Sequence, residues 1–377
     1  MSRIYPALLV LVGIALPPGL AAQGAGGFYS GVGALSGGEA RGFSFDPGYG
    51  TTKSLSQWRV PVVVVVPVTG PLSLDLTANY ADERLETYQG NVQTLSGFTD
   101  TQLRLLYTLS PDRLVGSISF NLPTGQGSVP TSQFGVAGAI ASNYLSFPVP
   151  NAGTAFGVTS GLAYAQHTGS WNVGFSGSVR YLASYQPFSD TSLSYTPGIE
   201  GRVRAGADRL VGERSRLLAG FTVSTFSSDT YSGSSYSPGT RFIADATFLR
   251  VIGRCTLTLA AWDLYRLAES GNGASIPATQ ENVLNGEARL TWPVGSRVQL
   301  EPMLAYRQWN PADSTGSYLG GHSESGGLTV RVTLADRVSL NALGRYDAGW
   351  IFDAASGSTG RANFTGYQGS LFVRVGQ

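Results

Sequence analysis

The sequence has little charge, one cysteine and one lysine. Charged residues make up 13% of the 377 residues, and Cys255, as the single cysteine, excludes an intramolecular disulfide. We therefore expect packing and backbone hydrogen bonds to stabilise the chain, with Cys255 as a small apolar residue within a strand. No function follows from Lys53 being the single lysine beside many arginines.

Long apolar runs are also missing, apart from one at the N-terminus. No internal run reaches the roughly 18 residues that a membrane-spanning helix needs. The N-terminal run combines the basic Arg3, an apolar stretch from Ala7 to Leu16 and small residues from Gly19 to Ala22. Because this order is typical of a secretory signal peptide, we predict a signal peptide over residues 1–22 and one domain over residues 23–377.

Motifs for cofactors, nucleic acids and catalysis are absent as well. The sequence has no metal-ligand spacing, phosphate loop or dinucleotide fingerprint, and no basic patch for nucleic acid. His167 adjoins a predicted short turn, and His322 precedes Ser323 and Glu324 in a predicted loop. Neighbours in sequence do not establish a catalytic triad, which is defined by geometry. We expect no cofactor, no metal, no nucleic-acid partner and no enzymatic activity.

What the chain does have is a repeated alternation of apolar and polar residues. Segments of about ten residues, such as 72–80, 171–181 and 297–307, alternate with a period of two. That period is typical of a strand with two different faces, in a soluble sandwich or in a barrel. Residues 53–68 fit least, because Pro61 lacks a donor and the run 62–66 is apolar on both faces. There we expect either a bulge or packing inside the sheet.

The connections between these segments decide between sandwich and barrel, because short turns alternate with long polar segments. The short turns are predicted at 69–71, 110–113, 168–170, 208–215, 250–254, 293–296 and 335–337. The long segments are predicted at 37–53, 82–99, 123–153, 183–197, 227–239, 268–281, 310–325 and 348–360. Seven turns and eight loops predict an all-β, antiparallel up-and-down barrel of about 16 strands, with short periplasmic turns and long extracellular loops.

Outward-facing aromatic residues of these strands fall at two depths. Those at the loop end are Trp58, Tyr80, Tyr181, Tyr306 and Tyr346, and those at the turn end are Tyr107, Tyr164, Trp171, Phe248 and Trp292. Two aromatic belts around an aliphatic band are typical of a barrel that crosses a membrane. We therefore predict that residues 23–377 form a transmembrane β-barrel in the bacterial outer membrane, in contact with lipid and lipopolysaccharide.

Predicted inward positions carry more arginine than carboxylate. The candidates for lining the pore are Arg104, Arg180, Arg202, Arg204, Arg241, Arg289, Arg297, Glu301, Arg307, Arg331 and Arg345. Arginines around a narrow pore favour anions or polar solutes. The alternative is that these arginines pair with carboxylates on neighbouring strands and only brace the wall. The predicted outer loops are acidic. Their carboxylates either share divalent cations with lipopolysaccharide or keep the cell surface solvated.

The third long segment, residues 123–153, contains no Asp, Glu, Lys or Arg. After Pro130, either Thr131 or Ser132 is placed to cap a helix. The apolar residues Phe134, Ala137, Ala141, Tyr144 and Leu145 then recur at helical spacing. Such a helix either folds into the barrel mouth as a constriction or gate, or packs on the rim. We favour the constriction, with Phe134, Tyr144 and Leu145 as its candidate residues.

With sixteen predicted strands and this third loop, the chain resembles the sixteen-stranded bacterial outer-membrane porins. The resemblance implies a channel narrowed by the third loop and insertion by the barrel-assembly machinery, and it allows a homotrimer. Those porins carry acidic residues on that loop, whereas Gln133, Phe134 and Gly135 stand here. The stretch Leu114 to Gly125, which ends in Leu-Pro-Thr-Gly, is similar to one in barrels associated with aromatic-compound degradation.

These patterns predict an outer-membrane channel or transporter that passes small solutes through an arginine-lined lumen narrowed by the third long loop. The alternative is a non-conducting surface barrel that acts as an adhesin or structural anchor. Sixteen strands favour the channel, because such barrels enclose water whereas eight-stranded barrels are filled by side chains. The solute stays open: a positive lumen argues for anions, and an uncharged third loop argues for apolar or neutral cargo.

Overall fold

The computed structural model describes residues 33–47, 50–111, 113–271, 280–313, 316–352 and 361–376. The predicted signal peptide, residues 1–22, lies outside the described residues. Among the helices of the described part, none is long and apolar enough to cross a membrane.

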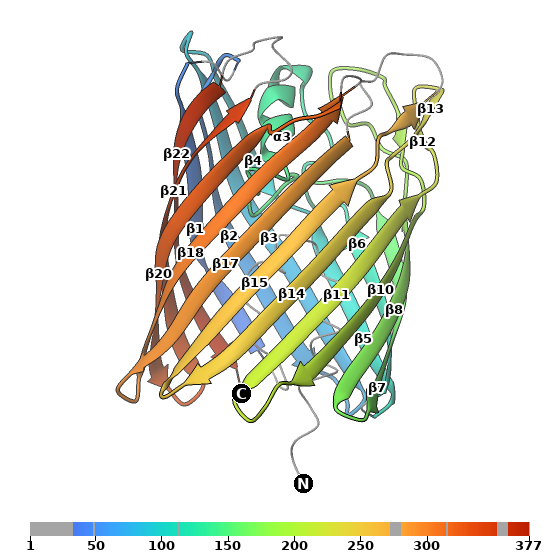
Figure 1. Cartoon of the computed structure of the whole chain (residues 1–377). Coiled ribbons are helices and arrows are strands. Elements are labelled where there is room, and N and C mark those ends of the chain that lie inside the picture. The colour runs from blue at the N-terminus through green and yellow to red at the C-terminus, as the bar shows by residue number, and fades with distance from the viewer. Residues whose placement is uncertain are drawn as a thin grey trace.

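Antiparallel strands form one closed wall (Figure 1). The N-terminal half of the wall contains β1 (Gly33–Phe45), β2 (Thr52–Pro67), β3 (Leu72–Thr87), β4 (Val92–Phe98), β5 (Thr101–Ser110), β6 (Leu114–Leu122), β7 (Gly157–Thr168), β8 (Trp171–Leu182) and β10 (Glu200–Leu210). The other half contains β11 (Ser215–Phe226), β14 (Arg241–Ile252), β15 (Cys255–Arg266), β17 (Gln280–Val294), β18 (Val298–Asp313), β19 (Gly316–Ser317), β20 (Gly321–Ala335), β21 (Val338–Phe352) and β22 (Arg361–Gly376).

The wall contains sixteen strands, as predicted. Its sheet has 18 segments, but β4 and β5 pair with successive parts of β3 and count as one strand, while β19 is a short extension beside β18. The last strand closes on the first, with β22 pairing with β1 from Gly33 opposite Gly376 to Phe45 opposite Phe364. Closure satisfies the backbone groups that an open sheet edge would leave unpaired in lipid. The predicted barrel and strand count are therefore confirmed.

The alternation of side chains places an apolar surface outside and a polar one inside. Outward residues such as Leu162, Val203 and Leu304 are more than half exposed, although they are large and apolar. Inward residues of the same wall, such as Asp75 and Arg204, are buried among polar partners. Large exposed aliphatic side chains around a whole barrel are costly in water and favourable in lipid.

The seven predicted short turns all join consecutive wall strands at one end of the barrel, where the C-terminus also lies (Figure 1). Gly169 has φ of 61° in the turn between β7 and β8, and Gly295 has φ of 74° between β17 and β18. These left-handed conformations favour glycine. The predicted placement of Cys255 in a strand is confirmed, because it begins β15.

On one side of the barrel, the wall is taller than the sequence indicates. Residues 37–53, predicted as a loop, contain most of β1, and residues 82–99 contain the end of β3 and all of β4. Aromatics predicted at strand ends therefore lie in mid-strand: β3 continues to Thr87 beyond Tyr80, and β21 continues to Phe352 beyond Tyr346. At about 3.3 Å per residue, such extensions add roughly 20 Å of wall beyond the outer aromatic belt.

Pro61 neither bends nor breaks its strand. The pairing of β2 with β3 runs in one register from Val60 opposite Tyr80 to Val62 opposite Ala78, so no bulge lies there. On the other side, β1 passes the proline with Gly37 and Gly38. A Cβ atom at Gly37 would lie 2.0 Å from the carbonyl oxygen of Leu371, so this seam requires glycine.

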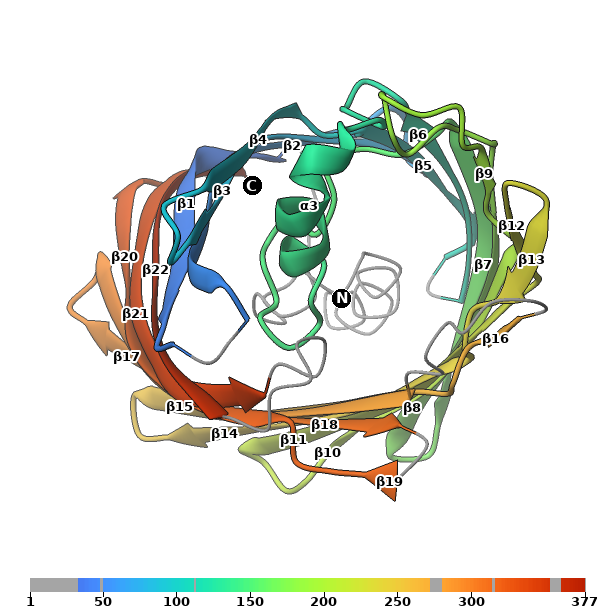
Figure 2. The ribbon, with the colours of Figure 1, turned by 90° about the horizontal axis from the view of Figure 1, so that it is seen from above.

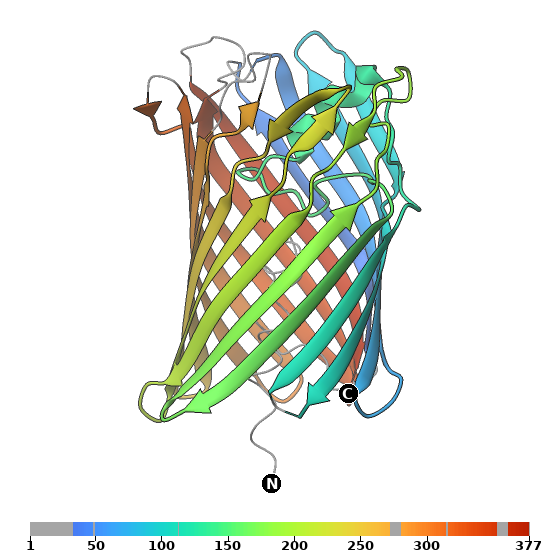
Figure 3. The same cartoon turned by 90° about the vertical axis from the view of Figure 1, so that its right-hand side faces the viewer.

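A small second sheet lies at the outer rim over β8 to β15 (Figure 3). It contains β9 (Tyr195–Thr196), β12 (Asp229–Tyr231), β13 (Ser234–Ser237) and β16 (Ser270–Gly271). Asp229 accepts hydrogen bonds from the Tyr195 hydroxyl at 2.5 Å and from the Gly198 backbone at 2.6 Å. Burial raises the pKa of the Tyr236 hydroxyl to about 12, so this rim remains uncharged at its tyrosines.

The lumen and the third loop as the candidate functional site

The third loop folds into the outer mouth of the barrel (Figure 2). It contains the 3-10 turn η1 (Thr131–Gln133) and the helix α3 (Phe134–Ile140). The predicted helix is present, but Gln133 is its N-cap residue and no side chain caps it. Thr131 instead donates its hydroxyl to Asp190 at 2.6 Å, which lowers the pKa of that carboxyl. The start of the loop is thereby attached to the next outer loop.

The loop is held by an apolar cluster on the inner face of the tall wall. Val136 and Ile140 of α3 are fully buried. The inward side chains that form the cluster with the loop are Phe43, Phe45, Leu55, Leu85, Leu95, Ile351 and Phe364. At roughly 1.5–3 kcal/mol for each large apolar side chain buried, the cluster is the main force that holds the loop. The extended strands therefore supply the surface on which the uncharged loop docks.

A buried glutamine of β2 fixes the descending part of the loop. Gln57 donates to the carbonyl oxygen of Val149 at 2.6 Å and accepts from the amide of Val149 at 2.9 Å. It also donates to Glu83 at 2.9 Å. The side-chain amide thus pairs with a backbone unit in the way that a neighbouring strand would. Gln93 of β4 adds a similar bond, because its oxygen accepts from the amide of Val136 at 3.1 Å.

The tip of the loop reaches the strands beyond the β1–β22 seam. Arg307 of β18 donates to the carbonyl oxygen of Tyr144 at 2.9 Å, and Trp309 stacks on the Tyr144 ring at 5.9 Å. The Tyr144 hydroxyl donates to the carbonyl oxygen of Trp350 at 3.3 Å, and burial raises the pKa of this hydroxyl. Asn143 donates to Glu281 at 2.6 Å. The loop therefore crosses the mouth from β6 to β17, β18 and β21.

The three predicted constriction residues lie in two different environments. Tyr144 and Leu145 are 3% and 1% exposed, so their side chains anchor the loop to the wall and do not face water. Phe134 is 59% exposed, and its ring lies against Phe188 at 5.6 Å. The helical spacing of the apolar residues predicted that the helix continues to Leu145. In the structure α3 ends at Ile140, so Tyr144 and Leu145 lie beyond the helix.

Most of the predicted pore-lining arginines pair with carboxylates on the same strand, on an adjacent strand or, for Arg204, on the next strand but one. Arg204 binds Asp245 through two bonds of 2.6 and 2.9 Å and also donates to Thr222. The other pairs are Arg104 with Asp75, Arg180 and Arg202 with Glu200, Arg289 with Glu287 and Glu301, and Arg345 with Asp347. Such pairs stabilise the wall, which is the alternative role considered for these arginines from the sequence.

Four predicted pore-lining arginines have no carboxylate partner within the described part of the chain. Arg307 donates to Asn285 and to the loop backbone, and Arg331 donates to Asn341 at 2.7 Å and Gln299 at 3.5 Å. Arg241 lies over the Phe226 ring at 5.1 Å, and Arg297 lines a hollow at the turn end. Neutral partners leave these four guanidinium groups without a direct ion pair, and Arg307 is itself buried, at 6% exposed.

Glu39, Arg41 and Gln57 shape the site but are not among the residues predicted from the sequence to line it. Glu39, Arg41 and Arg59 form a buried cluster, in which Glu39 accepts from Arg59 at 2.7 Å. The sequence predicts a loop over residues 37–53, so Glu39 and Arg41 have no predicted strand face. Gln57 carried one signal in the sequence, because it lies two residues before the charged Arg59 and therefore on the same face of the strand. Within the described residues, no group of three or more His, Cys, Asp or Glu residues is placed to hold a metal ion.

A closed sixteen-stranded wall with an outward apolar band and a polar interior defines a bacterial outer-membrane β-barrel. No family model matches the sequence, and no curated protein matches it. Among solved structures, the chain is similar to the outer membrane protein OmpT of Vibrio cholerae, with 13% identity, a TM-score of 0.40, and coverage of 90% of this chain and 97% of that chain. An anion-selective porin from Comamonas acidovorans is similar at 13% identity and a TM-score of 0.41, over 91% and 98% of the two chains. A bacterial polysaccharide outer membrane secretin is similar at 12% identity and a TM-score of 0.44, over 91% and 98%.

Proposed function

We propose that this protein is an outer-membrane channel that passes small, hydrophilic and preferably anionic solutes through an arginine-lined lumen narrowed by the third loop. The observation that carries the proposal is the set of inward arginines without carboxylate partners, Arg241, Arg297, Arg307 and Arg331, inside a closed sixteen-stranded wall. A barrel of this size has room for water, and uncompensated positive charge raises the local concentration of anions.

The distribution of these arginines supports passage along the whole barrel. Arg307 contacts the third loop at the outer mouth, Arg241 begins β14 near the loop end, and Arg297 and Arg331 lie at the turn end. A solute that crosses the lumen meets positive charge at both ends. The apolar side of the third loop is buried against the wall, so its lack of charge is explained by docking and is no argument for apolar cargo.

Planar-bilayer recording of the folded, reconstituted chain tests the proposal. We expect a steady ion current, and under a KCl gradient a reversal potential of the sign that marks chloride as the more permeant ion. Folded protein without current would contradict the channel and favour a surface adhesin or anchor. Liposome swelling with sugars, organic acids and aromatic compounds then ranks the solutes, and we expect organic acids to enter faster than sugars of equal size.

The contacts of the two histidines within the described residues do not include a carboxylate. The His322 ring lies between Tyr306 and Trp350, with ring centroids 6.1 and 5.2 Å away. His167 bonds to Asn172 at 2.8 Å at the turn end. Neither contact supplies the acid, base or nucleophile of a hydrolytic site. We further propose insertion by the barrel-assembly machinery and assembly as a homotrimer, which chemical crosslinking in the native membrane would test.

A further inference from the structure

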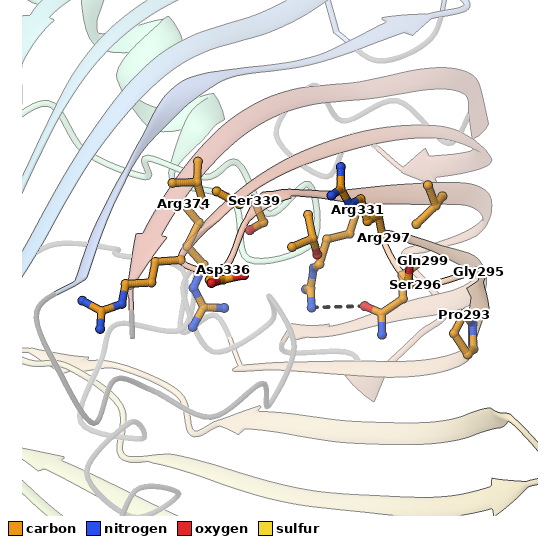
Figure 4. Close-up of a pocket in the computed structure, with 15 residues that line it drawn as sticks. Pro293, Gly295, Ser296, Arg297, Gln299, Arg331, Asp336, Ser339 and Arg374 are labelled. Atoms are coloured by element: carbon orange, nitrogen blue, oxygen red, sulfur yellow. Dashed lines mark hydrogen bonds between the residues drawn. The ribbon is translucent and has the colours of Figure 1, made fainter.

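The turn end of the barrel contains a hollow that is rich in arginine. It has a volume of about 350 Å³ and lies between the β17–β18 turn, the β20–β21 turn and the end of β22. Arg297, Arg331, Arg337 and Arg374 line it, together with one carboxylate, Asp336. Figure 4 shows Arg297, Arg331 and Arg374 around this hollow, with Ser296, Gln299 and Ser339 between them. The lining therefore carries four positive charges against one negative charge.

The arginines of this hollow differ from those of the middle of the wall. Arg204 and Arg104 are neutralised by carboxylates, whereas Arg331 bonds, among the residues that the structure describes, only to the neutral side chains of Asn341 and Gln299. Arg297 and Arg337 are exposed and have no side-chain partner among the described residues. Arg297, Arg331 and Arg337 thus line one hollow whose lining contains a single carboxylate, Asp336. An excess of like charge around one hollow is unfavourable, and a bound anion would relieve it.

We propose that this hollow binds a compact anion with at least two carboxylate or phosphate groups at the periplasmic mouth of the lumen. Guanidinium groups form paired, charge-assisted bonds to both kinds of oxyanion. A single carboxylate is satisfied by one such fork, so the uncompensated arginines call for a ligand with two or more. The volume suits a small molecule, since ligand pockets of about 300–1,000 Å³ hold molecules of that size.

This site rests on the proposed channel function, but its test measures binding and does not measure ion current. The full chain, folded in detergent, is titrated with pyrophosphate and with citrate by isothermal titration calorimetry, with maltose as the neutral control. We expect saturable binding of one or both anions, weakening as salt is added, and none of maltose. Binding of pyrophosphate alone identifies a phosphate site, and binding of citrate alone identifies a polycarboxylate site. If neither anion binds, or if maltose binds equally well, the proposal is overturned, and the channel proposal is unaffected.

A pair of double variants separates this site from the general charge of the turn end. Arg297→Gln with Arg337→Gln removes two arginines that hold no carboxylate, so the fold is retained and affinity falls by about tenfold or more. Arg214→Gln with Arg254→Gln removes two exposed arginines from other turns at the same end and serves as the matched control. Equal loss of affinity in both pairs, or no loss in the first, would overturn the site. Unchanged heat-modifiable mobility on gels verifies that each variant is folded.

Discussion

Replacing Gln57 with Leu gives the sharpest test of the third loop as a constriction. Gln57 forms two hydrogen bonds with the Val149 backbone and one with Glu83, all buried. Leucine keeps the volume and removes all three. Each buried group left without a partner costs about 1–3 kcal/mol, so the two groups of Val149 alone destabilise the docked loop by roughly 2–6 kcal/mol. The lower figure corresponds to about a thirtyfold rise in the ratio of undocked to docked loop.

Single-channel recording detects this shift as more frequent and longer openings to a larger conductance. Gln102→Leu is the matched control, because Gln102 faces the same lumen from β5 opposite Asn121, away from the loop contacts of Gln57. We expect Gln102→Leu to keep the wild-type conductance pattern. If Gln57→Leu also keeps that pattern while it folds normally, the docked loop does not limit the current, and the constriction is refuted.

Deleting residues 134–145 removes α3 and the loop tip, and we expect a larger unitary conductance; an unchanged current would count against the constriction. Arg204→Gln leaves Asp245 unpaired and should lower unfolding stability by about 1–3 kcal/mol in thermal melts, while adding Asp245→Asn restores part of it. Arg241→Gln should reduce chloride selectivity in reversal potentials, whereas the neutral double change at Arg204 and Asp245 should not; equal shifts would contradict the role of uncompensated arginines. The pKa of Asp190 is lowered, so its carboxylate stays ionised and bonded to the loop until the pH falls through that lowered value. Current noise should therefore be the same at pH 7 and pH 5.

The barrel itself could be predicted because the bilayer imposes strong local rules. Residues 72–80 alternate in period two, and six of the seven short turns, such as 168–170, contain glycine or proline, the exception being 335–337. Outward Tyr181 and Trp171 mark the two interfaces on one strand. These signals depend only on neighbours in sequence, and all led to the observed strands.

The tall side of the wall could not be predicted in the same way. Residues 37–45 are rich in glycine and polar side chains, so their local pattern favoured a loop. They form a strand because β22 and β2 pair with them on either side and the third loop covers Phe43 and Phe45. Strand preference of this kind depends on the neighbours in space, which the sequence of one segment does not contain.

The candidate site, too, could be predicted from the sequence only in part. Alternation along the strands predicted Arg204 and Arg307 on the inner face of the wall, because the face of a residue follows from the strand alone. Whether an arginine is neutralised depends on register, which places Asp245 near Arg204 but leaves only neutral partners at Arg307. The hollow at the turn end could not be predicted either, since Arg337 and Arg297 line it from two different turns that only the folded barrel brings together.

The surface that receives the third loop is assembled from the two ends of the chain. Phe43 belongs to the first strand and Phe364 to the last, and their rings touch at 5.5 Å. Tyr144 of the loop bonds to Trp350, which lies 206 residues further along the chain. This surface therefore does not exist until β22 has paired with β1, and contacts across such long separations form late in folding. The complete docking surface of the loop is therefore formed only in a barrel whose seam has closed.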